Sequence, residues 1–156
     1  MTSYKKMIGK RLYLAPIDID DAPFYLKWMN DEAVAKNYGQ YTALVSSASD
    51  LKWLFEPDRG VHRYGIVPLD GDVLIGSVSL HDIHPLNRTA FMGIFIGEAA
   101  YRGRGYGAEA IRLILEYGFK TMNLNNIMLS VHADNAAGIS CYKKVGFREA
   151  SRRREW

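Results

Sequence analysis

A short stretch in the second half of the chain carries the residue types that bind anions. Residues 101–110 read Tyr-Arg-Gly-Arg-Gly-Tyr-Gly-Ala-Glu-Ala, so glycines alternate with cations before good helix formers begin. Glycine lets the backbone approach a ligand closely and adopt positive φ. The unpaired N–H groups of a helix's first turn carry partial positive charge, and Arg102 and Arg104 add full charges. The stretch therefore predicts a site for an anion, most simply phosphate.

Two well-known phosphate loops fit this stretch poorly. A Walker loop requires Lys-Ser/Thr after its last glycine, and neither residue follows here. A dinucleotide fingerprint is matched by Gly103, Gly105 and Ala108, with Asp134 at the end of the next expected strand. However, residues 98–101 separate that loop from its strand, and only 49 residues follow Gly107. That length is too short for the rest of a doubly wound sheet.

The third pattern, Arg/Gln-x-x-Gly-x-Gly/Ala, is matched by residues 102–107. This loop resembles the pyrophosphate loop of the GNAT superfamily of N-acetyltransferases. The similarity extends over residues 93–147 and includes the ending Tyr-Lys-Lys-Val-Gly-Phe at 142–147. Gly-Glu-x-x-Tyr before the loop and Tyr-Gly-Phe after it resemble the branch that contains ribosomal-protein N-terminal acetyltransferases and spermidine acetyltransferases. Residues 11–28 show a weaker similarity of the expected kind.

The resemblance implies acetyl-CoA as co-substrate and no metal. Coenzyme A carries a pyrophosphate and a ribose phosphate, which suits two cations beside a glycine-rich nest of amides. Backbone groups near Phe95 and Ile96 are expected to pair with the pantetheine arm in a gap between two splayed parallel strands. The cofactor-binding residues that the resemblance implies are Phe95, Ile96, Gly97, Arg102, Gly103, Arg104, Gly105, Tyr106, Gly107, Ala108, Asn135 and Tyr142.

Tyr142 is the catalytic residue that the resemblance implies. An ordinary phenol titrates near 10 and so can protonate a departing thiolate at neutral pH. The alternative is a purely structural aromatic that packs against Val145. Asn135 is expected to bond the pantetheine, to cap the following helix, or both.

The general base stays open. Many relatives place a glutamate where this chain has Phe91, so that role cannot be carried over. Asp82, His84 and Glu98 are substitute candidates, and ordered water is another route. The pair His81 and His84 invites a metal site, but two histidines three apart without a third ligand support it weakly.

The elements that must position these residues follow from periodicity and turn signals. Strands are expected at 10–14, 62–69, 72–80, 89–97 and 127–133, with Asp70-Gly71 as a two-residue hairpin turn and a loop at 81–88. Helices are expected from the aspartates at 18–21 to about 29, at 49–55, from the glycine loop to about 118, and at 136–145 with Gly146 as terminator. A last strand begins at 147, and residues 37–47 receive no assignment.

This order predicts an α/β fold with antiparallel strands first and a parallel βαβ unit later. The resemblance implies that it is a GNAT-like mixed central sheet with antiparallel N-terminal strands, a splayed parallel strand pair and flanking helices. The 156 residues are one domain by size. Relatives continue beyond the position of Trp156 with a further strand, so residues 1–156 are expected to form one acetyltransferase domain that lacks it. The missing strand is then truncated, disordered or supplied by a partner that covers the open edge of the sheet. A homodimer is one such option.

Composition narrows the class of protein further. Cys141 is the single cysteine, the N-terminus lacks the apolar core of a signal peptide, and the longest apolar runs are too short for a membrane span. The net charge of +3 is accounted for by four arginines in the last nine residues, which gives little support to nucleic-acid binding. We therefore expect a cytoplasmic protein with no nucleic-acid or membrane partner.

The function that follows is transfer of an acetyl group from acetyl-CoA to a primary amine, either a small amine or a protein α-amine, by direct attack in a ternary complex. Two alternatives stay open at this level. One is a non-catalytic acetyl-CoA-binding protein, because Phe91 stands where relatives have a glutamate. The other is a dinucleotide-binding oxidoreductase.

Overall fold

The fold is built on a six-stranded sheet in which the strands follow one another in chain order, β1-β2-β3-β4-β5-β6. The computed structural model describes residues 4–38, 46–58 and 60–154. Its strands are β1 (Met7–Ile8), β2 (Leu12–Pro16), β3 (His62–Pro68), β4 (Gly76–His84), β5 (Thr89–Ile96) and β6 (Asn126–Met128). Pairing is antiparallel from β1 to β5 and parallel between β5 and β6. The predicted mixed sheet with antiparallel strands first is confirmed.

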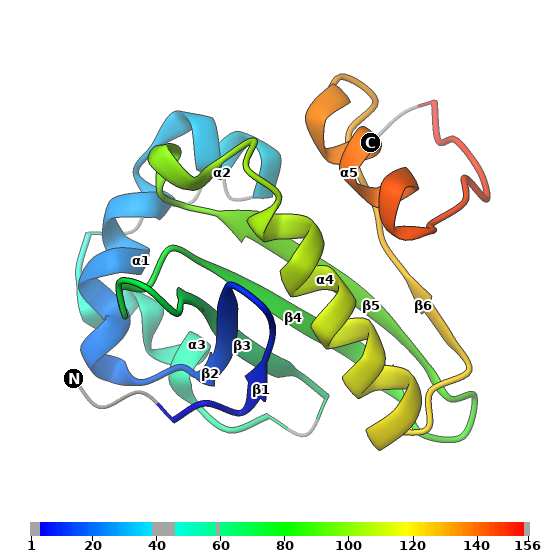
Figure 1. Ribbon diagram of the computed structural model, residues 1–156, viewed down its shortest axis with the longest axis horizontal. Coiled ribbons are helices and arrows are strands. Elements are labelled where there is room, and N and C mark those ends of the chain that lie inside the picture. Colours follow the sequence, from blue (N-terminus) through cyan, green and yellow to red (C-terminus); the bar gives the residue numbers. More distant parts are fainter. Residues whose placement is uncertain (1–3, 39–45, 59, 155–156) are drawn as a thin grey trace.

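Helices cover both faces of this sheet. They are η1 (Ile19–Asp21), α1 (Ala22–Met29), α2 (Glu32–Tyr38), η2 (Ala48–Leu51), α3 (Lys52–Phe55), η3 (Ala99–Tyr101), α4 (Tyr106–Glu116), the π-helical η4 (Tyr117–Thr121) and α5 (Ala136–Val145). In Figure 1, α4 crosses one face of the sheet, α1 lies beside the sheet, and α5 lies at the end of the segment that leaves β6. The sequence did not predict α2, and part of the unassigned stretch 37–47 lies outside the described residues.

Successive side chains of each strand point to opposite faces of the sheet, so the hydrophobic core is divided into two clusters, one on each face. Leu12 and Leu14 of β2 pack in the cluster that includes Ile111 and Ile114 of α4, whereas Tyr13 and Ala15 pack with the residues of α1 to α3. The same alternation holds on β5, where Ala90 and Met92 belong to the α4 side and Phe95 to the α1 side. A residue's place on β4 or β5 therefore decides which layer its side chain meets.

The predicted hairpin of β3 and β4 exists, but its turn is longer than expected. Ile66 pairs with Gly76, so residues 67–75 are not a two-residue Asp-Gly connection. Pro68, which ends β3, lacks the N–H that a continuing ladder needs. The amide of Asp72 donates to the Pro68 carbonyl over 3.1 Å, and Asp72 itself adopts φ 48°. These residues form a wider loop.

Several strand boundaries differ from the predictions. The first long strand is shifted to Leu12–Pro16, and β4 extends to His84 through the predicted loop, with a register irregularity between His81 and His84. β6 ends at Met128 instead of continuing to 133, because its only partner in the described part of the chain is β5 and the two separate there. Within residues 147–154 no strand forms, so the predicted C-terminal strand is absent from the described residues.

Helix signals in the sequence are confirmed. The Asp18 carboxylate accepts from the Asp20 amide and the Asp21 carboxylate accepts from the Asp18 amide, which begins the η1–α1 segment as the aspartates predicted. α5 has the predicted bounds and ends at Gly146 with φ 110°. Local capping thus fixes both helices that flank the candidate site.

Candidate functional site

The glycine loop between β5 and α4 has the backbone conformation that the sequence predicted. Gly103 and Gly105 adopt φ 69° and 85°, in the left-handed region that favours glycine. Gly105 is the N-cap of α4, and among the described residues no side chain caps that end of the helix. The first-turn N–H groups at Tyr106, Gly107 and Ala108 can therefore bind an anion, with the positive end of the helix dipole behind them.

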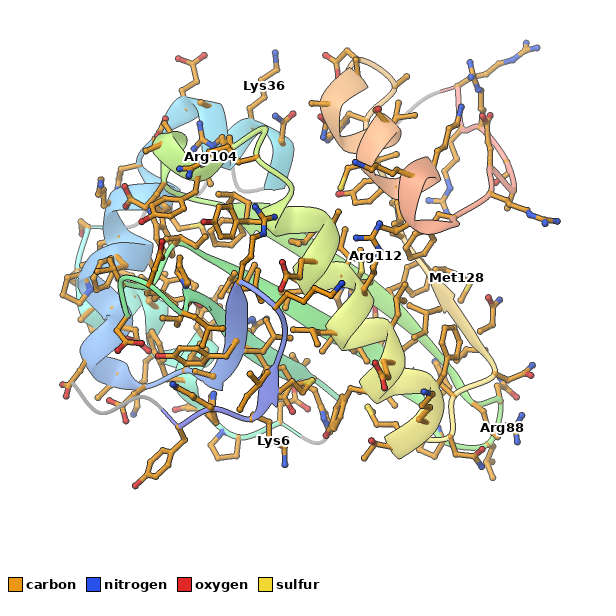
Figure 2. All side chains as sticks on the ribbon, in the orientation of Figure 1. Lys6, Lys36, Arg88, Arg104, Arg112 and Met128 are labelled. Atoms are coloured by element: carbon orange, nitrogen blue, oxygen red, sulfur yellow. The ribbon has the colours of Figure 1, made fainter. Side chains whose placement is uncertain are left out.

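Arg102 connects this loop to the end of β5. Its Nε donates to the Ile96 carbonyl and one terminal nitrogen donates to the Gly97 carbonyl, each over 2.9 Å. The half-buried guanidinium therefore fixes the entrance of the loop to the end of β5. Arg104 is exposed and donates to the Ala100 carbonyl over 3.2 Å. Figure 2 labels Arg104 at this end of α4.

A third arginine, Arg11, joins the loop from the turn between β1 and β2. It donates to the Arg104 carbonyl over 2.9 Å, and its guanidinium lies 4.4 Å from the centre of the Tyr106 ring. Arg104 lies 5.6 Å from the same ring. Contact with the same aromatic ring holds both cations near the glycines. Sequence reasoning missed Arg11, because its contacts lie more than ninety positions along the chain.

Glu109 anchors α4 to the same β1–β2 turn. Its carboxylate accepts from the Arg11 backbone amide over 2.8 Å and from Arg11 Nε over 3.2 Å. Burial acts to raise the pKa of Glu109, but these hydrogen bonds, with one from the Lys10 backbone, outweigh it and hold that pKa below its ordinary value. The charged form is thus favoured by the fold.

We expect Glu109→Gln to lower the free energy of unfolding at pH 7 by about 1–2 kcal/mol, since hydrogen bonds to a charged group are lost. Because the pKa of Glu109 is lower in the folded state, its charge stabilises the fold at pH values above the ordinary glutamate pKa. This stabilisation is lost as the pH falls through the folded-state pKa. The variant's deficit should therefore shrink in acid. Urea unfolding at neutral and acidic pH measures it. Glu116→Gln, which breaks only an exposed pair with Lys120, is the control; an equal effect there would contradict this anchoring.

The end of β5 is packed against α1 through Gly97. A β-carbon at Gly97 would lie 2.2 Å from atoms of the Trp28 ring, so the strand approaches the indole as closely as only glycine allows. The amides of Gly97 and Glu98 both donate to the Ile75 carbonyl, over 2.7 and 3.1 Å. The Gly97 backbone is therefore engaged within the chain, as is the Ile96 carbonyl, which accepts from Arg102.

Glu98 also has a structural role. Its carboxylate accepts from Lys27 over 2.8 Å and from the Trp28 indole N–H over 3.0 Å. The bonds from Lys27 and then Trp28 lower the pKa of Glu98, which makes it a poor proton acceptor. Of the other base candidates, His84 is exposed at the end of β4 opposite Thr89, and Asp82 contacts the neighbouring His81.

β5 and β6 separate as the sequence predicted. They pair at Thr89–Asn126, Ala90–Ile127 and Phe91–Met128, after which β6 ends and β5 continues to Ile96. Figure 1 shows the chain after β6 leaving the sheet toward α5. In the described part of the chain, β5 has no strand partner on this side beyond Phe91. A ligand with amide groups can take the place of the missing strand there.

α5 places Tyr142 and Asn135 beyond this edge. The Asn135 side chain accepts from the Gly138 amide over 3.0 Å, so it caps α5. Tyr142 is half-buried, and its ring packs edge-on against Phe147 with centres 6.1 Å apart. Burial, with a smaller contribution from Cys141, raises the pKa of Tyr142 above its ordinary value. The phenol therefore stays protonated at neutral pH and can donate.

Within the described ranges, no three His, Cys, Asp or Glu side chains lie together as a metal ion would require. In the same part of the chain, every helix is too short or too polar to cross a bilayer.

Comparison with known proteins places these features in a wider group. The model of the acetyltransferase (GNAT) domain matches residues 11–148. The chain is 28% identical over 151 residues to the probable N-acetyltransferase YjcK of Bacillus subtilis, covering 90% of this chain and 82% of that protein. It is 26% identical over 152 residues to the uncharacterized N-acetyltransferase p20 of Bacillus licheniformis, covering 94% and 84%.

A solved structure agrees with the fold. Spermidine N-acetyltransferase from Vibrio cholerae, in complex with CoA and spermine, superimposes with a TM-score of 0.82 at 25% identity, covering 92% of this chain and 84% of that one. The predicted mixed sheet with a splayed strand pair is thus that of a known fold, and the predicted similarity to spermidine acetyltransferases is confirmed.

Proposed function

Because the chain belongs to the GNAT family of acetyltransferases, we propose that it moves an acetyl group from acetyl-CoA to a primary amine by direct attack in a ternary complex. The observation that carries this proposal is the uncapped first turn of α4 behind two left-handed glycines, Gly103 and Gly105. Arg11 and Arg104 lie near the Tyr106 ring of that turn, and Arg102 adds a third positive charge at the loop entrance. Such a nest suits the pyrophosphate of coenzyme A.

The rest of the cofactor would follow the open edge of β5. With the phosphates at residues 102–108, the pantetheine arm runs back along Phe95 and Ile96 toward the point where β6 closes the edge at Phe91. A backbone N–H on this edge can also polarise the thioester carbonyl, where negative charge develops. Asn135 caps α5 beside the arm and has donor capacity left on its amide nitrogen.

Tyr142 would act as the acid. Its phenol is half-buried, protonated at neutral pH, and carried on the helix that borders the open edge. It would give its proton to the sulfur as the carbon–sulfur bond breaks. Packing against Phe147 fixes the ring, so the structural and the catalytic interpretation of Tyr142 are compatible.

The acceptor would be a small amine or the α-amine of a protein. The relative from Vibrio cholerae is in complex with spermine, which supports an amine of low molecular weight. We further propose a cytoplasmic protein that can form a homodimer. The alternative function, acetyl-CoA binding without catalysis, is favoured by Phe91, which supplies no base where many relatives have a glutamate.

An amine panel tests the proposal. We expect free thiol to be released from acetyl-CoA with at least one class of primary amine, including polyamines and peptides with free N-termini. Binding of acetyl-CoA without thiol release from any acceptor would instead support the non-catalytic alternative. A shift in Tm with NAD but not with acetyl-CoA would contradict both.

Substitution of the loop arginine should weaken cofactor binding. We expect Arg102→Ala to raise the Kd for acetyl-CoA about tenfold, or about 1.4 kcal/mol, through lost charge and a loosened loop entrance. The charge part of the effect should shrink at high salt. Calorimetric titration at low and high ionic strength measures it. Arg152→Ala, in an exposed pair with Glu149, is the matched control; equal Kd values for both variants would contradict the phosphate assignment.

A further inference from the structure

His81 lies on β4, next to the strand that carries the open edge. It pairs across the sheet with Phe91, and the two rings stack with centres 6.1 Å apart and planes 22° apart. Because Phe91, Gly93 and Phe95 alternate on one face of β5, and Phe95 packs with α1, His81 also faces the α1 layer. This is the face opposite α4, the helix that begins at the glycine loop.

The second ring nitrogen of His81 points over Gly93. A β-carbon at Gly93 would lie 3.7 Å from His81 Nε2 and 3.4 Å from the hydroxyl oxygen of Ser79. Gly93 has no side chain, so the space between the imidazole and the β5 backbone stays open. Any larger residue at position 93 would fill it. The geometry therefore places the basic Nε2 of His81 close to the β5 backbone, with the position of the missing Gly93 side chain between them.

Asp82 orients the imidazole. His81 Nδ1 lies 3.2 Å from the Asp82 carboxylate, and this contact favours the tautomer with the proton on Nδ1. Asp82 adopts φ 48° at the register irregularity between His81 and His84, a distortion that re-aims side chains on a strand. The His81 side chain is 38% exposed, so a soluble substrate can reach Nε2, which is left as the free acceptor.

The reacting atoms of the proposed reaction fall at the same place. If the phosphates occupy residues 102–108, the arm extends along β5 and cannot pass Phe91, where Met128 closes the edge. The thioester end of the arm is thus confined to the part of β5 next to Gly93. This step rests on the proposed function, since it needs acetyl-CoA in that orientation.

We propose that His81, held by Asp82, is the general base for the acceptor amine. Its neutral Nε2 takes a proton from the incoming ammonium, and the freed lone pair attacks the thioester carbonyl carbon. As the tetrahedral intermediate collapses, the carbon–sulfur bond breaks and the sulfur takes the Tyr142 proton. The remaining extra proton on the amide nitrogen passes to the tyrosinate, and the imidazolium releases its proton to water, so one proton leaves per turnover. His81 thereby supplies what Phe91 does not.

The test compares acceptors of different basicity. With an amine that is charged at assay pH, His81→Gln should lower kcat at least tenfold while the KM for acetyl-CoA stays within twofold. With an acceptor that is neutral at the same pH, such as a hydrazide, the loss should shrink to about twofold. A purely structural role would instead lower both rates equally, and that result would overturn the proposal.

Two further variants complete the experiment. His81→Ala should regain turnover when imidazole is added, and no recovery would count against the base assignment. His62→Gln, which removes an imidazole on β3 that bonds Tyr117 and lies outside the proposed site, is the matched control and should keep the wild-type kcat. If the wild type acetylates an amine and His81→Gln does so with the same kcat, only the base assignment fails. If the wild type acetylates nothing, the proposed function fails with it.

Discussion

Tyr142→Phe should lower turnover at least tenfold, equivalent to about 1.4 kcal/mol of transition-state stabilisation, while leaving the Kd for acetyl-CoA nearly unchanged. The substitution removes the phenol that would protonate the departing thiolate and keeps the ring that packs against Phe147. The raised pKa of Tyr142 means that the wild-type group is protonated throughout the neutral range. The measurement is kcat from thiol release, with Kd from calorimetry.

A second tyrosine provides the control for this substitution. Tyr117→Phe also deletes one hydroxyl, but Tyr117 lies in η4 and that hydroxyl bonds His62 within the protein. We expect it to change stability more than turnover. If Tyr142→Phe left kcat unchanged, Tyr142 would have only its packing role and the acid would have to be sought elsewhere.

Gly97→Ala should destabilise the fold by about 3 kcal/mol and lower Tm by roughly 6–12 °C. The new β-carbon would lie 2.2 Å from the Trp28 ring, which is fully buried and held by Glu98, so neither side can yield cheaply. Displacement of the end of β5 should also disturb the carbonyl that Arg102 binds. Thermal and urea unfolding without cofactor measure the loss.

Gly107→Ala is the matched control, because its β-carbon would meet nothing closer than 4.0 Å and its backbone is helical. Alanine favours a helix over glycine, so stability should change by no more than about 1 kcal/mol, in either direction. A similar loss in both variants would show that glycine content, rather than the contact with Trp28, explains the effect.

Local signals explain which parts of the fold the sequence could predict. α5 begins at an Asn135 cap and ends at Gly146, and both signals lie within the helix's own neighbourhood. The positive φ of Gly103 and Gly105 could likewise be predicted, because the residues of the anion-binding loop are consecutive in the sequence. Where a conformation is decided by adjacent residues, the pattern predicts it.

Contacts between distant segments explain most of what could not be predicted. Arg11 and Glu109 are 98 positions apart, and no local pattern marks either as part of the phosphate-loop region. Glu98 is a plausible base until the folded chain brings Lys27 and Trp28 to its carboxylate. The sequence stays largely apolar from Ile127 to Ala133, but a strand also needs a partner, and beyond Met128 the chain no longer pairs with β5.

The central claim is that the amides of the first turn of α4, with the arginines around them, hold the phosphates of the cofactor. Calorimetric titration of the wild-type protein with acetyl-CoA and with S-acetylpantetheine tests it most directly, because the second compound keeps the thioester and the arm but lacks every phosphate. We predict that acetyl-CoA binds at least a hundredfold more tightly, a difference of about 2.7 kcal/mol. Equal affinity for the two compounds would contradict the claim.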